Sequence, residues 1–360
     1  MATQLEYALM AGAAYASTRG SVNEIPAPQG WTEIAHPVND ASGFEAAIFQ
    51  RGTEIVISFA GTGPGLWNGD WSTNVLSALG AVTEQLKQAA LYYEQIKATN
   101  PPGTTLISFT GHSLGGGLAA LMGVFFNKLA MTFDQAPFRN AANTTVRDSL
   151  ASYLATFGIT DTDLAGFTNT TFVSRENNVA GLYVEDEALT YVPFSRIGAQ
   201  GPLPNGNSAF ALLTGMAGDL HSQALLTAFE QYDPFRAVSL KLPNMIKLIF
   251  DSKIYKFSTS VENTKDINFI EHLVRHQALD SGPGADMLKH FTNDMQDIVK
   301  AGGKAQDQYN NLNKALIAFG IQAYYEQVNA FTKEAFESFG GGVRFDRAMI
   351  AGDYLLHRSA

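Results

Sequence analysis

The alternation of apolar and polar positions predicts strands and helices in turn along the first half of the chain. Residues 44–50 and 53–60 read as two strands joined by a tight turn at Arg51 and Gly52, the second apolar enough to be central. Residues 84–98 carry apolar side chains at helical spacing, and residues 170–174 (TTFVS) read as a further short strand. Such alternation predicts an α/β sheet covered by helices.

The segment 106–126, LISFTGHSLGGGLAALMGVFF, contains a single ionisable side chain, His112, and is long enough to be considered as a membrane span. Its middle opposes that interpretation, because polar and flexible residues at 110–113 and three glycines at 115–117 lie where a span should be most apolar. The segment is better divided in two. We predict a short buried strand over 106–110 and an apolar helix over 118–126.

The junction between these two elements reads Gly111-His112-Ser113-Leu114-Gly115, a G-x-S-x-G pattern. A nucleophile on a sharp strand-to-helix turn needs small residues two positions before and after it, because larger side chains would clash with the strand and the helix. The pattern therefore predicts Ser113 as a nucleophile. The alternative is an ordinary glycine-rich turn.

A serine nucleophile needs a general base, and after a nucleophile elbow the acid and then the histidine follow in the chain. His221 fits this order, because it lies between a glycine-rich loop and an apolar helix; an exposed or capping histidine is the alternative. His272 and His276 have the i, i+4 spacing of metal ligands, but Leu273 stands where a zinc protease has glutamate. We expect a solvated helix face there, and neither a metal nor a cofactor.

An oxyanion hole needs one amide from the residue after the nucleophile, Leu114, and one from a loop that follows an earlier strand. The segment SFAGTGPG ends the strong strand and turns at once, so Thr62 is the expected second donor, with a plain glycine-rich turn as the alternative. A cluster of large apolar residues follows, which reads either as a mobile flap over the site or as core: Trp67, Trp71, Leu76 and Leu79.

Composition narrows the functional classes. A net charge of -10 argues against nucleic acid or an anionic membrane as a partner, and the absence of cysteine excludes disulfides and thiolate chemistry. The first residues lack the basic start of a signal peptide, so we expect a cytoplasmic location by default, with secretion through an uncleaved signal as the alternative. Amphipathic helices dominate from about residue 243 onward, including 309–331, so we expect a core over 1–240 and a helical extension over 241–360.

Together, VISFAGT, DWSTN, FTGHSLGGGLAAL and the later His221-Ser222 resemble the class 3 lipases, the fungal-type triacylglycerol lipase family, over residues 46–226. The resemblance implies an α/β-hydrolase fold with a central, mostly parallel sheet, Ser113 as nucleophile, His221 as base, Thr62 and Leu114 as oxyanion donors, and a lid around residues 67–79. The chain departs from the family at Ala60, where arginine is frequent, and at RENNVAG, where an Asn-Asp pair usually supplies the acid.

The triad acid is expected just after the sheet strand that follows the nucleophile helix. The family's usual aspartate aligns best with Asn177, a neutral amide that cannot stabilise an imidazolium. Glu176, one position earlier, is the first candidate, and Asp186 in YVEDEALTY is the alternative.

The expected function is that of a lipase-type serine esterase acting on acylglycerols or related lipid esters, with a lipid–water interface as a possible site of action. A catalytically silent lipid-binding module and an amide or thioester hydrolase with the same triad are the alternatives.

Overall fold

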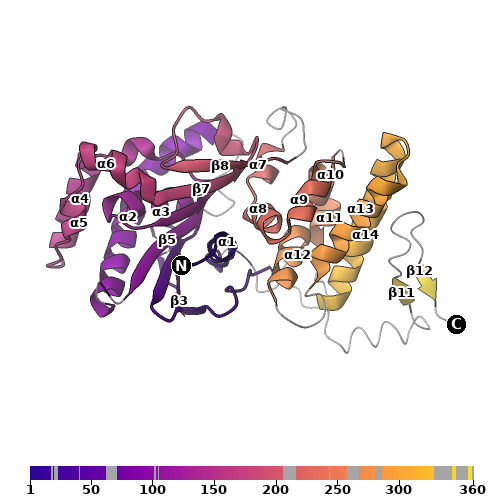
Figure 1. Cartoon of the computed structure of the whole chain (residues 1–360), viewed down its shortest axis with the longest axis horizontal. Coiled ribbons are helices and arrows are strands. Elements are labelled where there is room, and N and C mark those ends of the chain that lie inside the picture. Colours follow the sequence, from indigo (N-terminus) through magenta and orange to yellow (C-terminus); the bar gives the residue numbers. More distant parts are fainter. Residues whose placement is uncertain are drawn as a thin grey trace. The chain divides into compact units, whose positions relative to one another are not determined.

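The computed structural model of the chain describes residues 1–17, 19, 23–39, 41–61, 71–100, 103, 105–205, 216–242, 244–257, 267–279, 286–327, 343–345 and 356–358. The chain divides into two compact units, labelled element by element in Figure 1. Unit 1 comprises Met1–Thr18 and Pro26–Leu203, and unit 2 comprises Arg19–Ile25 and Pro204–Ala360.

The strands of unit 1 form one mixed sheet in the order β1-β3-β4-β5-β6-β7-β8, with β2 paired to the free length of β3. From β4 to β8 every neighbouring pair is parallel, whereas β1, β3 and β4 pair antiparallel. The strands are β1 (Thr32–Ala35), β2 (Val38–Asn39), β3 (Phe44–Arg51), β4 (Glu54–Phe59), β5 (Leu106–His112), β6 (Ala130–Phe133), β7 (Val179–Val184) and β8 (Ala199–Leu203).

The predicted hairpin and the predicted division of residues 106–126 are both confirmed. Arg51 of β3 pairs with Glu54 of β4, and Gly52 turns the chain at a φ of 58°. Strand β5 is followed by helix α3 (Leu114–Phe125), with only Ser113 between them.

Alternate residues of β5 face opposite sides of the sheet, which brings a helix to each side. On one side, the Tyr7 hydroxyl of α1 (Gln4–Ala13) donates to Ser108 Oγ at 2.9 Å. On the other, the Phe109 ring lies 5.4 Å from the Tyr93 ring of α2 (Trp71–Thr99). Helix α3 packs against α2, β5 and β6, so the turn at Ser113 joins the sheet to the helical layer on this side.

The segment predicted as a strand over 170–174 is instead helix α6 (Asn169–Arg175), so that prediction is wrong. A capping box begins the helix: the Thr171 amide donates to Thr168 Oγ1 at 3.1 Å, and the Thr168 amide donates to Thr171 Oγ1 at 2.8 Å. These local bonds outweigh the strand preference of the β-branched residues. The sheet strand of this region is β7, which begins at Val179.

The remaining helical elements of unit 1 cover the sheet and connect its strands. They are η2 (Arg139–Ala141), α4 (Thr144–Ala155), α5 (Thr162–Ala165), η3 (Glu176–Asn178) and η4 (Ala188–Tyr191).

Unit 2 is mainly helical, as predicted for the C-terminal region, and the helix predicted over 309–331 corresponds to α14. Its boundary differs from the expected residue 240, because α8 packs on α12 and α9 packs on α13 within this unit. Its elements are α7 (Ala217–Leu220), α8 (Gln223–Gln231), α9 (Asp233–Ser239), α10 (Met245–Ile249), α11 (Ser252–Tyr255), β9 (Lys256–Phe257), β10 (Ile267–Asn268), α12 (Phe269–Ala278), α13 (Met287–Ala301), α14 (Ala305–Gln327), β11 (Val343–Phe345) and β12 (Leu356–Arg358).

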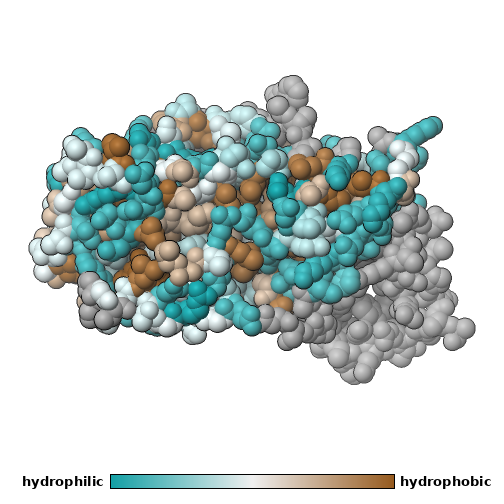
Figure 2. All heavy atoms as spheres, in the orientation of Figure 1, coloured by the Kyte–Doolittle hydropathy of each residue, from teal (hydrophilic) through white to brown (hydrophobic). Residues whose placement is uncertain are grey.

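The described surface carries scattered apolar side chains. On the face shown in Figure 2, hydrophobic residues form separate patches among hydrophilic ones. Phe157 and Val173 of unit 1 are examples of exposed large apolar residues, and single residues of this kind are normal on protein surfaces. Within the described residues, no helix combines the length and the hydropathy needed to cross a membrane.

Candidate active site

Ser113 occupies a strained turn between β5 and α3. Its φ of 59° and ψ of -125° lie outside the regions that ordinary residues prefer, and such strain typically costs roughly 1–3 kcal/mol. The surrounding structure holds the turn: the Ser113 amide donates to the Phe133 carbonyl at 3.0 Å, and the Ala136 amide donates to the Ser113 carbonyl at 2.9 Å. A serine fixed in this way on a strand-to-helix turn has the backbone of a nucleophile elbow.

The glycines around Ser113 are required by close backbone contacts. A Cβ on Gly115 would lie 2.0 Å from the Phe59 carbonyl oxygen of β4, and a Cβ on Gly111 would lie 2.4 Å from the Gly115 carbonyl oxygen. Real carbon and oxygen atoms do not approach so closely. The turn can therefore reach this position beside β4 only with glycine at both positions, which is the requirement inferred from the G-x-S-x-G pattern.

Leu114 is the first residue of α3. The amides in the first turn of a helix have no intrahelical carbonyl partner and carry the positive end of the helix dipole. The Leu114 amide thus belongs to a group of donors suited to stabilising an oxyanion beside Ser113.

The carboxyl ends of the parallel strands gather polar residues at the edge of the sheet where Ser113 lies. Asp134 directly follows β6 and has a φ of 41°, and Asp186 follows β7 with a φ of 61°. Positive φ at non-glycine residues is uncommon and is concentrated at functional sites. In parallel sheets, this carboxyl edge is also where ligands bind.

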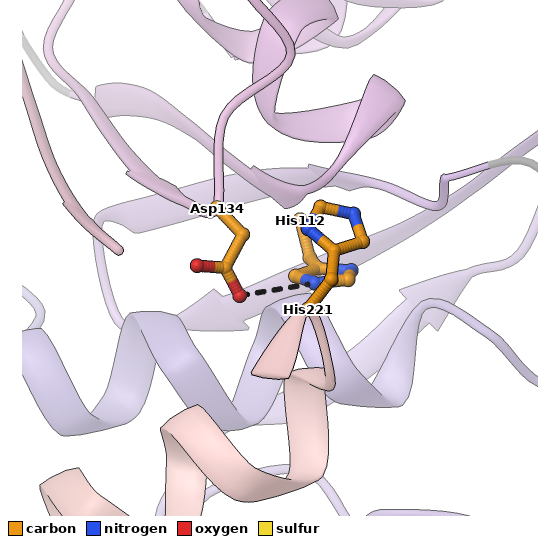
Figure 3. Close-up of side chains that lie close together, drawn as sticks. All are labelled: His112, Asp134 and His221. Atoms are coloured by element: carbon orange, nitrogen blue, oxygen red, sulfur yellow. Dashed lines mark ion pairs between the residues drawn. The ribbon is translucent and has the colours of Figure 1, made fainter. Parts of the chain in front are cut away.

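Asp134 is a fully buried carboxyl group close to the turn at Ser113. Its Oδ1 accepts a hydrogen bond from the Val184 amide at 2.9 Å, and its Oδ2 lies 3.5 Å from His112 Nε2. The dashed line in Figure 3 marks the contact between Asp134 and His112. Burial, and then the neighbouring charge of Glu187, raise the pKa of Asp134 well above its usual value.

Glu187 is a second buried carboxylate at the same edge, just beyond β7. It forms an ion pair with Arg196 and accepts a hydrogen bond from the Leu189 amide at 2.7 Å. Arg196 is fixed in turn, because its Nε donates to the Gln135 carbonyl at 2.9 Å. A cation and a backbone donor thus stabilise the ionised form of Glu187.

Glu176, the first candidate for the triad acid, lies at the opposite edge of the sheet. It belongs to η3, which precedes β7, so the length of a strand separates it from the carboxyl edge. Arg139 binds both of its carboxylate oxygens, through Nε at 2.9 Å and Nη2 at 2.8 Å, and this bonding lowers the Glu176 pKa. A position before a parallel strand does not fit an acid that must serve a nucleophile located after one.

Asp186, the alternative acid, lies at the carboxyl edge but is only partly buried, and it accepts a hydrogen bond from the Tyr191 hydroxyl at 3.3 Å. Sequence patterns did not identify its neighbour Glu187, or the more distant Asp134, as candidates for the triad acid. The available signal was the same in both cases: an acidic residue closely following a short apolar run, AMTF before Asp134 and GLYV before the group at 185–187.

His221 belongs to unit 2, at the junction between α7 and α8. Its amide donates to the Ala217 and Gly218 carbonyls, each at 3.2 Å, and Ser222 caps α8 by accepting from the Leu225 amide at 3.3 Å. The residue therefore lies at an element boundary, where the sequence placed it. Asp219, two residues earlier, has its pKa raised to about 6 by burial.

His272 and His276 do not lie on a solvated helix face, so that expectation is wrong. Both are buried in α12 with ring centroids 4.3 Å apart, and burial lowers the pKa of His272 to about 3. Neither takes part in a group of three metal-ligating residues among the residues that the structure describes.

Two predicted site residues, Thr62 and Trp67, fall outside the described residues. Helix α2 includes the other three members of the predicted flap, of which only the backbone is described: Trp71, Leu76 and Leu79.

A parallel sheet covered by helices on both faces, with a strained serine between a strand and an apolar helix, defines an α/β-hydrolase. The chain belongs to the family of Tle-like phospholipase domains, whose model, described as phospholipase-like, matches residues 6–228. The predicted fold class and the predicted relation to lipase-type ester hydrolases are thereby confirmed.

One curated relative and several solved structures are similar to parts of the chain. It is 40% identical over 95 residues to "Extracellular phospholipase A1" of Serratia liquefaciens, an alignment that covers 26% of this chain and 28% of that protein. The chain thus spans about a quarter of that relative. A lipase from Rhizopus microsporus var. chinensis is 16% identical with a TM-score of 0.35, covering 56% of this chain and 73% of the lipase. A triacylglycerol lipase from Penicillium expansum is 13% identical with a TM-score of 0.33, covering 56% and 78%.

Proposed function

We propose that the protein is a serine hydrolase that cleaves lipid carboxylic esters through an acyl-enzyme on Ser113. The observation that carries the proposal is the strained Ser113 turn, which only glycine at 111 and 115 permits. A turn that stores strain around an otherwise ordinary serine has an evident use if it presents the hydroxyl to a substrate.

In the proposed reaction, Ser113 Oγ attacks the ester carbonyl carbon and passes its proton to His221. The Leu114 and Thr62 amides stabilise the oxyanion of the tetrahedral intermediate. Collapse of the intermediate breaks the ester bond, and the protonated His221 donates its proton to the leaving alcohol. Water, deprotonated by His221, then releases the fatty acid and restores Ser113. The roles of His221 and Thr62 are supported by chain order and by the resemblance to class 3 lipases.

We assign the triad acid to Glu187 in place of Glu176. The acid must be ionised to stabilise an imidazolium, and Arg196 and the Leu189 amide favour the ionised form of Glu187. Asp134 fits less well, because burial and the charge of Glu187 raise its pKa, whereas the Arg196 cation pairs with Glu187. Asp186 also lies at the carboxyl edge of the sheet, but it is more exposed than Glu187, and it remains the alternative.

The proposed substrates are glycerophospholipids first and acylglycerols second. The family description and the name of the Serratia relative favour the phospholipid, and the names of the fungal structures favour the acylglycerol. The apolar residues of the predicted lid, Trp67, Trp71, Leu76 and Leu79, would then close over the acyl chain or meet the lipid surface.

Labelling with an organophosphonate tests the proposal directly. We expect one covalent adduct, on the peptide that contains Ser113, formed in parallel with the loss of ester hydrolysis. Ser113→Ala should abolish the adduct and lower kcat by at least about 10³-fold while the thermal unfolding transition is kept. Near wild-type activity in Ser113→Ala would remove the central claim.

The same experiment separates the alternatives. A silent lipid-binding module would bind phosphatidylcholine vesicles without labelling or turnover. An amide or thioester hydrolase would be labelled, yet would cleave a matched amide or thioester faster than the ester. Phosphatidylcholine with two different acyl chains, assayed beside a triglyceride, identifies the preferred lipid and the released chain.

A further inference from the structure

Tyr15, which follows helix α1 closely in the chain, is buried against the nucleophile turn. Its hydroxyl lies 2.8 Å from Nδ1 of His112 and 3.3 Å from the His112 carbonyl oxygen. The two rings meet edge to face with centroids 5.9 Å apart. Because His112 immediately precedes Ser113, this phenol contacts both the side chain and the backbone that lead into the nucleophile.

The other nitrogen of His112 continues the same chain of polar contacts. His112 Nε2 lies 3.5 Å from Asp134 Oδ2 (Figure 3). The Tyr15 hydroxyl donates to the His112 carbonyl oxygen and lies within hydrogen-bond distance of Nδ1, so one phenol group holds both the backbone and the ring of His112. Side chains near α1 and at the ends of β5 and β6 are thereby connected around Ser113.

Tyr15 also reaches the start of the expected oxyanion loop. A Cβ built on Gly61 would lie 2.4 Å from the Tyr15 hydroxyl, 3.0 Å from the His112 carbonyl oxygen and 3.1 Å from Ser113 Cβ. The hydroxyl therefore packs where a side chain at position 61 would project. Gly61 directly precedes Thr62, so one phenol group contacts the residue before the nucleophile and the residue before the expected second amide donor.

We propose that Tyr15 is a positioning residue for ester attack. Its hydroxyl fixes the position of the His112-Ser113 turn relative to the Gly61 backbone. The proposal rests on the function proposed for Ser113. It predicts that removal of one hydroxyl group, remote in sequence from the nucleophile, slows acylation of Ser113 without weakening substrate binding.

Helix α1 offers a matched control. Tyr7 has an equally buried hydroxyl that donates to Ser108 Oγ at 2.9 Å, on the same strand but away from the turn. Tyr15→Phe and Tyr7→Phe each remove one buried phenol hydroxyl, so both should lower the unfolding midpoint by similar amounts. If Tyr15 had only a structural role, this loss of stability would be the only effect of Tyr15→Phe.

The measurement is the second-order rate of organophosphonate labelling at Ser113, together with kcat and KM on a soluble ester. We expect Tyr15→Phe to lower the labelling rate and kcat by about 10-fold, the loss of one well-placed hydrogen bond, with KM unchanged. Tyr7→Phe should stay within about two-fold of wild type in both rates. Equal rates in the two variants would overturn the proposal.

Gly61→Ala tests the same contact with Tyr15 intact. Its new methyl group meets the hydroxyl, so labelling should slow to below the Tyr15→Phe rate. In the double variant Gly61→Ala/Tyr15→Phe, where the shortest contact is gone, labelling should rise back to the Tyr15→Phe rate. Unchanged labelling in Gly61→Ala, or no recovery in the double variant, would contradict the proposed packing. A wild-type protein that is neither labelled nor active would instead overturn the proposed function itself, and the role of Tyr15 with it.

Discussion

Replacing Glu187 by glutamine should nearly abolish ester hydrolysis, whereas the same replacement of Glu176 should leave it almost unchanged. Glutamine has the shape of glutamate without its charge, so each variant removes mainly the carboxylate. At position 187 the lost charge is the one that would stabilise the protonated base. At position 176 the lost charge faces Arg139 at the amino-terminal end of β7, away from Ser113.

The expected magnitudes follow from burial and charge. Removal of a triad carboxylate lowers kcat by about 10⁴-fold in a serine protease, so we expect a loss of at least about 10²-fold in Glu187→Gln with little change in KM. Glu187 is 0% exposed and Arg196 is 12% exposed, so breaking this pair should also cost about 3–5 kcal/mol of stability. Glu176 and Arg139 are 20% and 41% exposed, which limits the cost of Glu176→Gln to roughly 1 kcal/mol or less.

The assay must separate lost activity from unfolding. Both variants and Asp186→Asn should be compared with wild type on a soluble ester, at a temperature where circular dichroism shows each protein folded. Glu187→Asp keeps the charge on a shorter side chain and should retain more activity than Glu187→Gln. Collapse of activity in Glu176→Gln, with Glu187→Gln within a few-fold of wild type, would refute the assignment based on strand direction.

Three further predictions test the elbow, the lid and a carboxyl pair remote from the site. Gly115→Ala forces a methyl group into a backbone oxygen of β4 and should lower the free energy of unfolding by at least about 2 kcal/mol in urea titrations; a smaller loss would contradict the tight packing of the turn. Trp67→Ser combined with Leu76→Ser should slow hydrolysis of emulsified long-chain ester more than that of soluble ester, and equal rates on both would count against a lid. Burial, followed by the charge of Asp161, raises the pKa of Glu94 to about 7, so the stability it contributes is present below pH 4.5 and is lost as the pH rises through about 7. Glu94→Gln should therefore stabilise the protein at pH 8 by up to about 3 kcal/mol and change little at pH 4.5, and an equal shift at both pH values would oppose this reasoning.

The sequence by itself determined the features that depend on short stretches of chain. The β3–β4 hairpin, the strand and helix on either side of Ser113, and the glycines at 111 and 115 were all predictable, because each follows from local periodicity or from the steric demands of one turn. The relation to lipase-type hydrolases was readable from the same local motifs.

Only the tertiary structure decided which residues share an edge of the sheet. A short strand such as β6, with AMTF as its whole length, gives almost no periodic signal, and a capping box at Thr168 made a helix of a segment with strand-like composition. The sheet strand spans Val179–Val184 and not residues 170–174. Glu176 therefore lies before the strand, at the amino-terminal edge of the sheet, and Glu187 lies after it, at the carboxyl edge. The contact of Tyr15 with His112, 97 residues apart in the chain, likewise arises only when α1 packs on the central strands. A short stretch of sequence can specify the backbone strain of a single turn. The order and direction of the strands determine which side chains surround that turn, and a local sequence pattern does not specify strand order or direction.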